Sequence, residues 1–193
     1  MSATVILDDF SSGPFSIGSS EDSRYGSSII SPLAEHRSIS ATLNDTANWS
    51  ASVDTVISTL VYSANNPSLS TRLRVTYSNA PGTHLNLIGF NAFVLQVDSL
   101  NGVGQLFVFE GIGSTFEGVI PVDLNTTGEL VIPFANMNSS NPTNPSEVTF
   151  FFRPEGEEFS ISISSIGVIP EPSSAIMMSL GAFALMLRRK RNQ

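Results

Sequence analysis

The chain has 193 residues, a formal net charge of −8 at pH 7 and no cysteine. Without cysteine, neither a disulfide framework nor a thiolate metal site can form, although a chain of this length can bury a core without them. Four of the nine basic residues stand together at 188–191, so the rest of the chain carries five basic and seventeen acidic residues, a net charge of −12. We call this rest of the chain the body. A body this acidic repels phosphate backbones, which argues against nucleic acid as a partner.

The first residues, MSATVILDDFSSGPF, do not have the pattern of a secretory signal. No basic residue precedes the apolar run, and that run extends only from Val5 to Leu7. Two interpretations follow: the protein stays inside the cell, or a leader lies upstream of this sequence. The carboxyl end of the chain favours the second.

Alternation of apolar and polar residues predicts β-strands along most of the chain. In LSTRLRVTYS, one face carries Leu73, Val75 and Tyr77, and the other carries Arg72, Arg74 and Thr76. In SEVTFFFRP, one face carries Val148, Phe150 and Phe152, and the other carries Thr149, Phe151 and Arg153. Turn residues separate such runs, and Asn101-Gly102 between two apolar runs predicts a hairpin turn.

About ten to twelve short strands, with no segment long enough for a crossover helix, indicate an all-β fold. We expect an antiparallel β-sandwich, jelly-roll-like, followed by a short C-terminal hydrophobic helix. In the later half of the body, strands are predicted at 84–98, 104–110, 116–122, 128–134, 147–153 and 158–166, with an acidic turn before the last. Their phenylalanines are expected in the core: Phe107, Phe109, Phe150, Phe151 and Phe152.

The order of these closing strands, from GELVIPF through VTFFF to the final Ile-Gly-Val, resembles jelly-roll domains of the galactose-binding-like type. That group includes many carbohydrate-binding modules. The opening VILDDFSSG is similar to the first strand of such domains. The resemblance implies a jelly roll over roughly residues 4–168.

The carboxyl end has three parts in a fixed order. Pro170-Glu171-Pro172 cannot continue a helix or a central strand, and it predicts a stiff, accessible linker. The uncharged run from Ser173 to Leu187 would span about 22 Å as a helix, which is short of the roughly 30 Å hydrocarbon core but enough for a marginal span. The cluster of Arg188, Arg189, Lys190 and Arg191 follows at once, and it is expected on the cytoplasmic side.

This tail resembles the PEP-CTERM sorting signal of exported bacterial proteins. The resemblance implies an exosortase-type membrane protease as a partner, cleavage at or near Pro170-Glu171-Pro172, and association with extracellular polymeric matrix. It also implies a Gram-negative-type envelope, a membrane-anchored precursor and a final place at the cell surface or in the matrix. The alternatives are a hydrophobic helix that packs on the domain and a plain membrane anchor. We therefore divide the chain into a β-sandwich at 1–168 and a sorting tail at 169–193.

The sequence contains no recognisable catalytic motif. His36 and His84 lie far apart, no nucleophile stands in a Gly-x-Ser-x-Gly elbow, and the paired glycines lack a dinucleotide fingerprint. Seventeen carboxylates always permit a glycosidase-like pair, but sequence alone does not show which two face each other. The interpretation is therefore a protein that is not an enzyme, with a glycoside hydrolase as a minor alternative.

Asp8-Asp9 are candidate ligands for a structural calcium ion, which takes six to eight oxygen ligands. Galactose-binding-like modules often carry such an ion, so the resemblance points the same way. The alternative, which we favour, is that the pair caps a strand and faces water. No other cofactor is expected.

Trp49, the single tryptophan, is a candidate ligand contact because sugar-binding faces use exposed aromatic rings. Its neighbours Asn48 and Ser50 are polar, which suggests that one side of its strand is exposed to solvent. Tyr25 and Tyr62 are weaker candidates of the same kind. The alternative for each is a place in the core.

These observations predict an exported, non-enzymatic component of the cell envelope or extracellular matrix. The alternative function is that of a carbohydrate-binding module, which would bind exopolysaccharide through an aromatic face.

Overall fold

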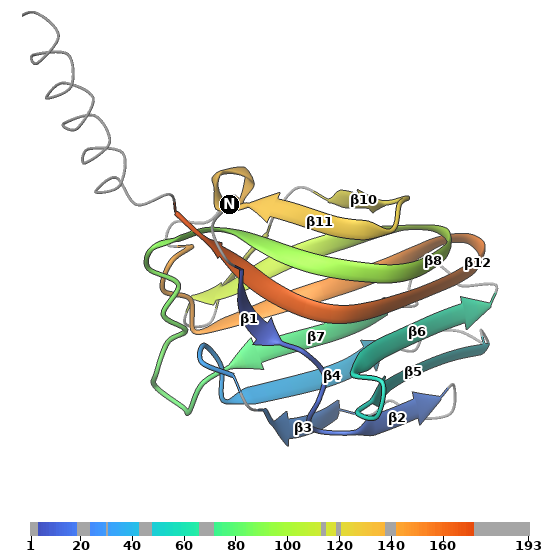
Figure 1. Ribbon diagram of the computed structural model, residues 1–193, viewed down its shortest axis with the longest axis horizontal. Helices are drawn as coiled ribbons and strands as arrows, with labels where there is room; N and C mark the ends of the chain where they lie inside the picture. The colour runs from blue at the N-terminus through green and yellow to red at the C-terminus, as the bar shows by residue number, and fades with distance from the viewer. Residues whose placement is uncertain are drawn as a thin grey trace, which may run out of the picture.

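The computed structural model describes residues 4–18, 24–29, 31–42, 48–65, 72–112, 115–118, 121–137 and 142–171. These residues form twelve β-strands and one 3-10 helix, Phe134–Asn136 (Figure 1). The strands are β1 (Val5–Asp8), β2 (Phe15–Gly18), β3 (Arg24–Ser28), β4 (His36–Thr42), β5 (Asn48–Asp54), β6 (Thr59–Asn65), β7 (Arg72–Ser78), β8 (Phe90–Ile112), β9 (Thr115–Gly118), β10 (Val122–Leu124), β11 (Gly128–Pro133) and β12 (Glu147–Pro170). The predicted all-β fold is confirmed.

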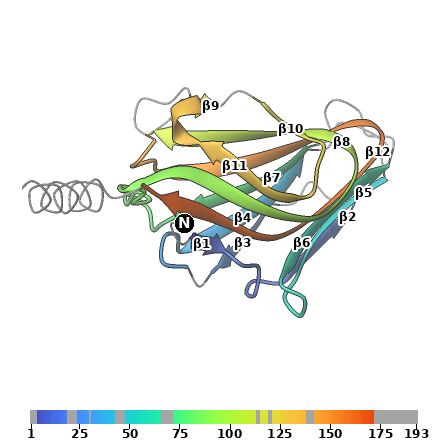
Figure 2. The same ribbon diagram turned by 45° about the horizontal axis from the view of Figure 1, so that its top comes forward.

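Two long neighbouring strands organise the molecule. β8 has 23 residues and β12 has 24, and they pair antiparallel along nearly their whole length. Both strands bend at the same place, where the pairing jumps from Glu155 opposite Val103 to Ser160 opposite Asn101. The sheet folds over at this bend (Figure 2).

The fold-over creates two layers from one continuous antiparallel sheet. In the first layer the strand order is β3-β4-β7-β12-β8, with residues 147–155 of β12 and 103–111 of β8, and β9 and β10 pair with the free edge of β8. In the second layer the order is β2-β5-β6-β12-β8-β11, with residues 158–170 of β12 and 90–101 of β8. β1 pairs with the end of β12 in this second layer.

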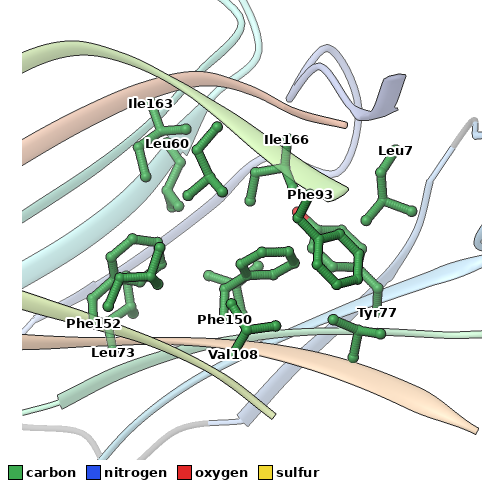
Figure 3. Packing of buried hydrophobic residues seen from close by; sticks show 14 of the residues in the cluster. Leu7, Leu60, Leu73, Tyr77, Phe93, Val108, Phe150, Phe152, Ile163 and Ile166 are labelled. Carbon is green, nitrogen blue, oxygen red and sulfur yellow. The ribbon is translucent and has the colours of Figure 1, made fainter. Parts of the chain in front are cut away.

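The inner faces of the two layers enclose the hydrophobic core (Figure 3). The ring of Phe93 in the second layer meets Phe150 in the first edge-on, with 5.3 Å between ring centroids. Phe150 also lies edge-on to Tyr77, at 6.0 Å, on the neighbouring strand β7. The other core residues labelled in Figure 3 are buried in the same way: Leu7, Leu60, Leu73, Val108, Phe152, Ile163 and Ile166.

The predicted hairpin at Asn101-Gly102 is wrong, because β8 runs through both residues without reversing. Gly102 has a φ of +84° and lies at the bend, where a Cβ atom would collide with the carbonyl oxygen of Glu158. The predicted acidic turn is the matching bend in β12, where Gly156 has a φ of +92°. Glycine can adopt a positive φ, which is often used to build a tight turn. In this protein the same freedom lets two paired strands bend together.

Other predicted boundaries also differ from the structure. The strand predicted at 116–122 falls on two strands, β9 and β10. Strand β8 begins at Phe90, not at residue 84; before it, Leu85 and Leu87 are buried, and their N–H groups donate to the carbonyl oxygens of Pro145 and Thr143. Strand β12 continues through Pro170, beyond the predicted end of the body at 168.

The remaining tail residues, 172–193, lie outside the described part of the chain. They include Pro172, the predicted membrane segment from Ser173 to Leu187 and the basic cluster. No helix within the described part has the length and apolar character needed to cross a membrane.

Candidate functional site

A hollow of about 630 Å³ lies on the outer face of the first layer, on the side away from the core. It spans four adjacent strands, β4, β7, β12 and β8. Its lining combines aromatic rings, guanidinium groups, hydroxyls and one carboxylate: Ser40, Arg72, Arg74, Thr76, Phe107, Phe109, Glu147, Thr149, Phe151 and Arg153.

Strand register brings these side chains into rows across the sheet. Ser40 pairs with Arg74, Arg74 with Phe151, and Phe151 with Phe107, so one row crosses all four strands. Because neighbouring positions along a strand point to opposite faces, residues two apart on one strand share this surface.

A second row of side chains lies on the same face, two residues away along each strand. Thr76 pairs with Thr149, and Thr149 pairs with Phe109. The hydroxyls of the two threonines are hydrogen-bonded to each other over 2.8 Å.

Three phenylalanine rings form the floor of the hollow. Phe107 and Phe109 stack with an interplanar angle of 10° and 6.1 Å between centroids. Phe151 lies edge-on to both, at 5.7 Å from each centroid, and is 6% exposed. Phe107 and Phe109 are partly exposed, so their rings are accessible to a ligand.

Arginine side chains pack on this floor. The guanidinium carbons of Arg72 and Arg74 lie 5.2 Å and 5.4 Å from the ring centroid of Phe151, and that of Arg153 lies 5.1 Å from Phe107. These distances are within the range of cation–π attraction. Arg153 is held further, because its Nη2 donates to Gln105 Oε1 and, over 3.0 Å, to Glu155 Oε1.

This face was not predicted from the sequence, because all five phenylalanines were expected in the core. Phe150 and Phe152 are indeed fully buried, but Phe107, Phe109 and Phe151 point to the opposite face of the same strands. The signal was present in the alternation itself: the middle residue of a Phe-Phe-Phe run must face away from its neighbours. Pairing that face with the Arg-x-Arg face of 72–74 would have predicted the cluster.

The predicted aromatic contacts lie elsewhere. Trp49 on β5 is 4% exposed and Tyr62 on β6 is fully buried, and both belong to the hydrophobic core of the second layer. Neither ring therefore presents a face to solvent in this structure, which is the core alternative considered for each. Burial also raises the pKa of Tyr62. Tyr25 is in β3, and its side chain lies outside the described part.

Asp8 lies in a buried ion pair, so it does not face water as expected. Its Oδ2 is 2.6 Å from Nη1 of Arg37 and accepts a 2.9 Å hydrogen bond from the hydroxyl of Tyr77. Asp8 Oδ1 accepts the N–H of Phe10 over 2.8 Å. The pKa of Tyr77 lies well above its ordinary value, because of burial first and the charge of Asp8 second.

Asp9 is exposed, and its Oδ1 accepts hydrogen bonds from the hydroxyl and N–H of Ser11, which lower the pKa of its carboxyl. No three acidic or histidine side chains gather as a metal site within the described ranges. Calcium at Asp8-Asp9 stays a prediction, and Asp8 would have to leave Arg37 to bind it.

The end of β12 joins the body to the tail. Val168 is fully buried between Val5 of β1 and Phe93 of β8. Pro170 pairs with Phe90, and the exposed Glu171 donates its N–H to the carbonyl oxygen of Gly89 over 2.8 Å.

Residues 168–191 match the PEP-CTERM protein-sorting motif. The predicted tail is therefore confirmed as a sorting motif, and it begins within strand β12. A PEP-CTERM motif indicates an exported protein that is processed at the membrane.

Comparison with solved structures shows the fold of the body. A family 11 carbohydrate-binding module of a cellulosomal cellulase from Clostridium thermocellum aligns with a TM-score of 0.50 and 13% identity, over 89% of this chain and 96% of that one. A family 12 xyloglucanase from Bacillus licheniformis aligns with a TM-score of 0.52 and 10% identity, over 81% of this chain and all of that one. Among curated proteins no match was found. The predicted jelly-roll-like sandwich is confirmed at the level of fold.

Proposed function

We propose that the body is a carbohydrate-binding domain whose ligand lies in the hollow on the outer face of the first layer. The observation that carries this proposal is the partly exposed stack of Phe107 and Phe109, surrounded by hydrogen-bonding groups. Aromatic rings pack on the C–H faces of sugars, while a few fixed polar groups orient the hydroxyls. Likeness in fold to a carbohydrate-binding module supports the proposal.

The floor of the hollow is ordered before any ligand arrives. The rings of Phe107, Phe109 and Phe151 fix one another, and cation–π contacts hold the arginines on them. A preorganised site loses less side-chain entropy on binding. Four neighbouring strands supply the surface, which suits an extended polymer better than a compact metabolite.

The sorting tail would deliver this domain to its ligand. We propose that an exosortase-type protease removes the tail from a membrane-anchored precursor, and that the body then remains at the cell surface or in the extracellular matrix. The motif at residues 168–191 supports this route. In this account the body attaches to exopolysaccharide, and the purely structural matrix role predicted first becomes the alternative.

We propose binding without hydrolysis. Glycoside hydrolases generally use two carboxyl groups, roughly 5–9.5 Å apart, on either side of the scissile bond. Among the described residues that line the hollow, Glu147 is the single carboxylate. The xyloglucanase-like fold makes hydrolysis the rival, and release of reducing sugar from glucans by the purified body would establish it.

Affinity electrophoresis through gels that contain neutral or acidic polysaccharides tests the binding proposal. Phe107→Ala should abolish retardation, because it removes half of the exposed stack. Val131→Ala is the matched control, since Val131 is an exposed apolar residue on β11 of the opposite layer. If no polysaccharide retards the wild-type body, the carbohydrate-binding function is wrong and the structural role stands.

A further inference from the structure

Most of the arginines outside the carboxy-terminal cluster line the hollow. Outside the carboxy-terminal cluster the chain has five basic residues against seventeen acidic ones. Three of the five line the hollow: Arg72, Arg74 and Arg153. A fourth, Arg37, is buried in its pair with Asp8. Such a distribution is unexpected for a surface that only needs solubility.

The lining of the hollow therefore carries more positive than negative charge. Three guanidinium groups face one carboxylate, that of Glu147. Arg153 is partly compensated by Glu155, at 3.0 Å. Arg74 is exposed, and no ion pair joins it to a carboxylate of the described residues. Its positive charge is thus available to a ligand.

Arg72 and Arg74 also approach the same ring, that of Phe151. Of the two, Arg74 is the exposed one, and a bound anion could pair with its charge. Contact with the ring limits the movement of the Arg74 side chain, and a guanidinium can form two parallel hydrogen bonds to a carboxylate. Lysine in the same place would supply charge without this geometry.

The ligand chemistry that fits is a sugar ring that carries a carboxylate. The ring face would stack on Phe107 and Phe109, and the carboxylate would reach Arg74 from the same side of the sheet. A polyphosphate fits less well, because it offers no sugar-ring face to stack on Phe107 and Phe109. We infer that the hollow selects an acidic polysaccharide built from uronic acids; this inference rests on the proposed carbohydrate-binding function.

A matched pair of ligands tests the inference. The body is titrated with polygalacturonate, alginate and hyaluronate, and with the carboxyl-reduced form of each, which keeps the sugar backbone and removes the charge. At least one acidic polymer should bind about tenfold or more tightly than its reduced form. That preference should weaken steeply as salt is raised, since a surface charge is screened.

Protein variants assign the preference to the hollow. Arg74→Gln should lose about tenfold in affinity for the acidic polymer and nothing for the reduced one. Arg74→Lys should recover part of the loss. Because Arg74 is exposed, both variants should fold, and their melting temperatures check this. The control is Glu129→Gln on β11 of the opposite layer, which changes a charge outside the hollow.

The outcomes separate the two proposals. Equal or tighter binding of neutral polymers, unaffected by Arg74→Gln, overturns the acidic-ligand inference and leaves the carbohydrate-binding function standing. Binding to no polymer, acidic or neutral, overturns both. A preference for acidic polymers that Arg74→Gln does not reduce places the recognition outside the hollow and also overturns the inference.

Discussion

The backbone N–H of Glu171 donates a 2.8 Å hydrogen bond to the carbonyl oxygen of Gly89. The sorting motif therefore starts inside the folded body, because its first residues are the last residues of β12. Val168 has Phe93 on one side and Val5 on the other. A protease that acts on the motif meets a chain that is paired through Pro170.

This attachment predicts where processing stops. Cleavage before Val168 would remove a fully buried side chain and the partner of Val5 in β1, and loss of such a side chain costs about 1–3 kcal/mol. We expect the mature protein to end at Glu171 or beyond it, and without residues 188–191. Intact mass of the extracellular form measures this end. A mature form that ends before Pro170, or one that keeps Arg188, contradicts the account.

Because Gly102 lies at the bend in β8, we expect its substitution to reduce stability strongly. Gly102→Ala must tolerate a φ of +84° and move the Glu158 carbonyl, so we expect a loss of about 2 kcal/mol or more in the free energy of unfolding. Gly82→Ala is the control, with a φ of +85° and no atom within 4 Å of the added carbon. It isolates the backbone strain, about 1–2 kcal/mol. Equal losses in urea unfolding would show that the bend is loosely packed.

Two buried tyrosines predict a loss of stability in alkali. The folded pKa of Tyr62 is raised by burial, and that of Tyr77 by burial and by Asp8. Their stabilising effect is therefore complete below the unfolded pKa of about 10 and falls as the pH rises above it, because the unfolded state releases the phenolic proton first. Urea unfolding at pH 7 and above pH 10 measures the change.

Substitution of each tyrosine by phenylalanine supplies the control for this prediction. The Tyr62 hydroxyl has no hydrogen-bond partner among the described residues. We therefore expect Tyr62→Phe to be neutral or stabilising at pH 7 and to reduce the alkaline loss. Tyr77→Phe should cost about 1.5–3 kcal/mol at pH 7, because it removes the bond to the Asp8 carboxylate. An unchanged alkaline slope in Tyr62→Phe would contradict the assignment.

The Asp8–Arg37 pair predicts a large loss when one partner is removed. Arg37→Met leaves the Asp8 carboxylate buried without its cation, at a cost of about 3–5 kcal/mol, as measured by chemical unfolding. Asp9→Asn, next along the chain but exposed, should change stability by less than about 1 kcal/mol. Because Arg37 already supplies the positive charge at Asp8, calcium chloride should not raise the melting temperature. A calcium-dependent rise that Asp9→Asn abolishes would instead support the calcium site at Asp8-Asp9.

Alternation and turn residues were enough to predict the all-β sandwich, and the ordered tail was enough to predict the sorting motif. They did not predict the fold-over. Asn-Gly supplies positive φ to a hairpin turn, and Gly102 uses the same φ inside a strand whose neighbour bends with it. The choice between turn and bend depends on pairing with β12, a contact between residues about 50 positions apart.

The candidate site was hidden for a related reason. Trp49 has polar neighbours, and in an alternating strand polar neighbours indicate that the residue between them faces inward. The phenylalanines of the hollow were assigned to the core because apolar residues are usually buried. Only the side-by-side placement of β7, β12 and β8 brings arginines and phenylalanines onto one surface.

Amide hydrogen exchange of the body, with and without a polysaccharide that it binds, locates the ligand on the sheet. Binding in the hollow should add protection in β7 and in the first-layer parts of β8 and β12, at residues 72–76, 105–109 and 147–153, and none in β11. Protection confined to β11 and the second-layer part of β8 would contradict the placement of the ligand in the hollow.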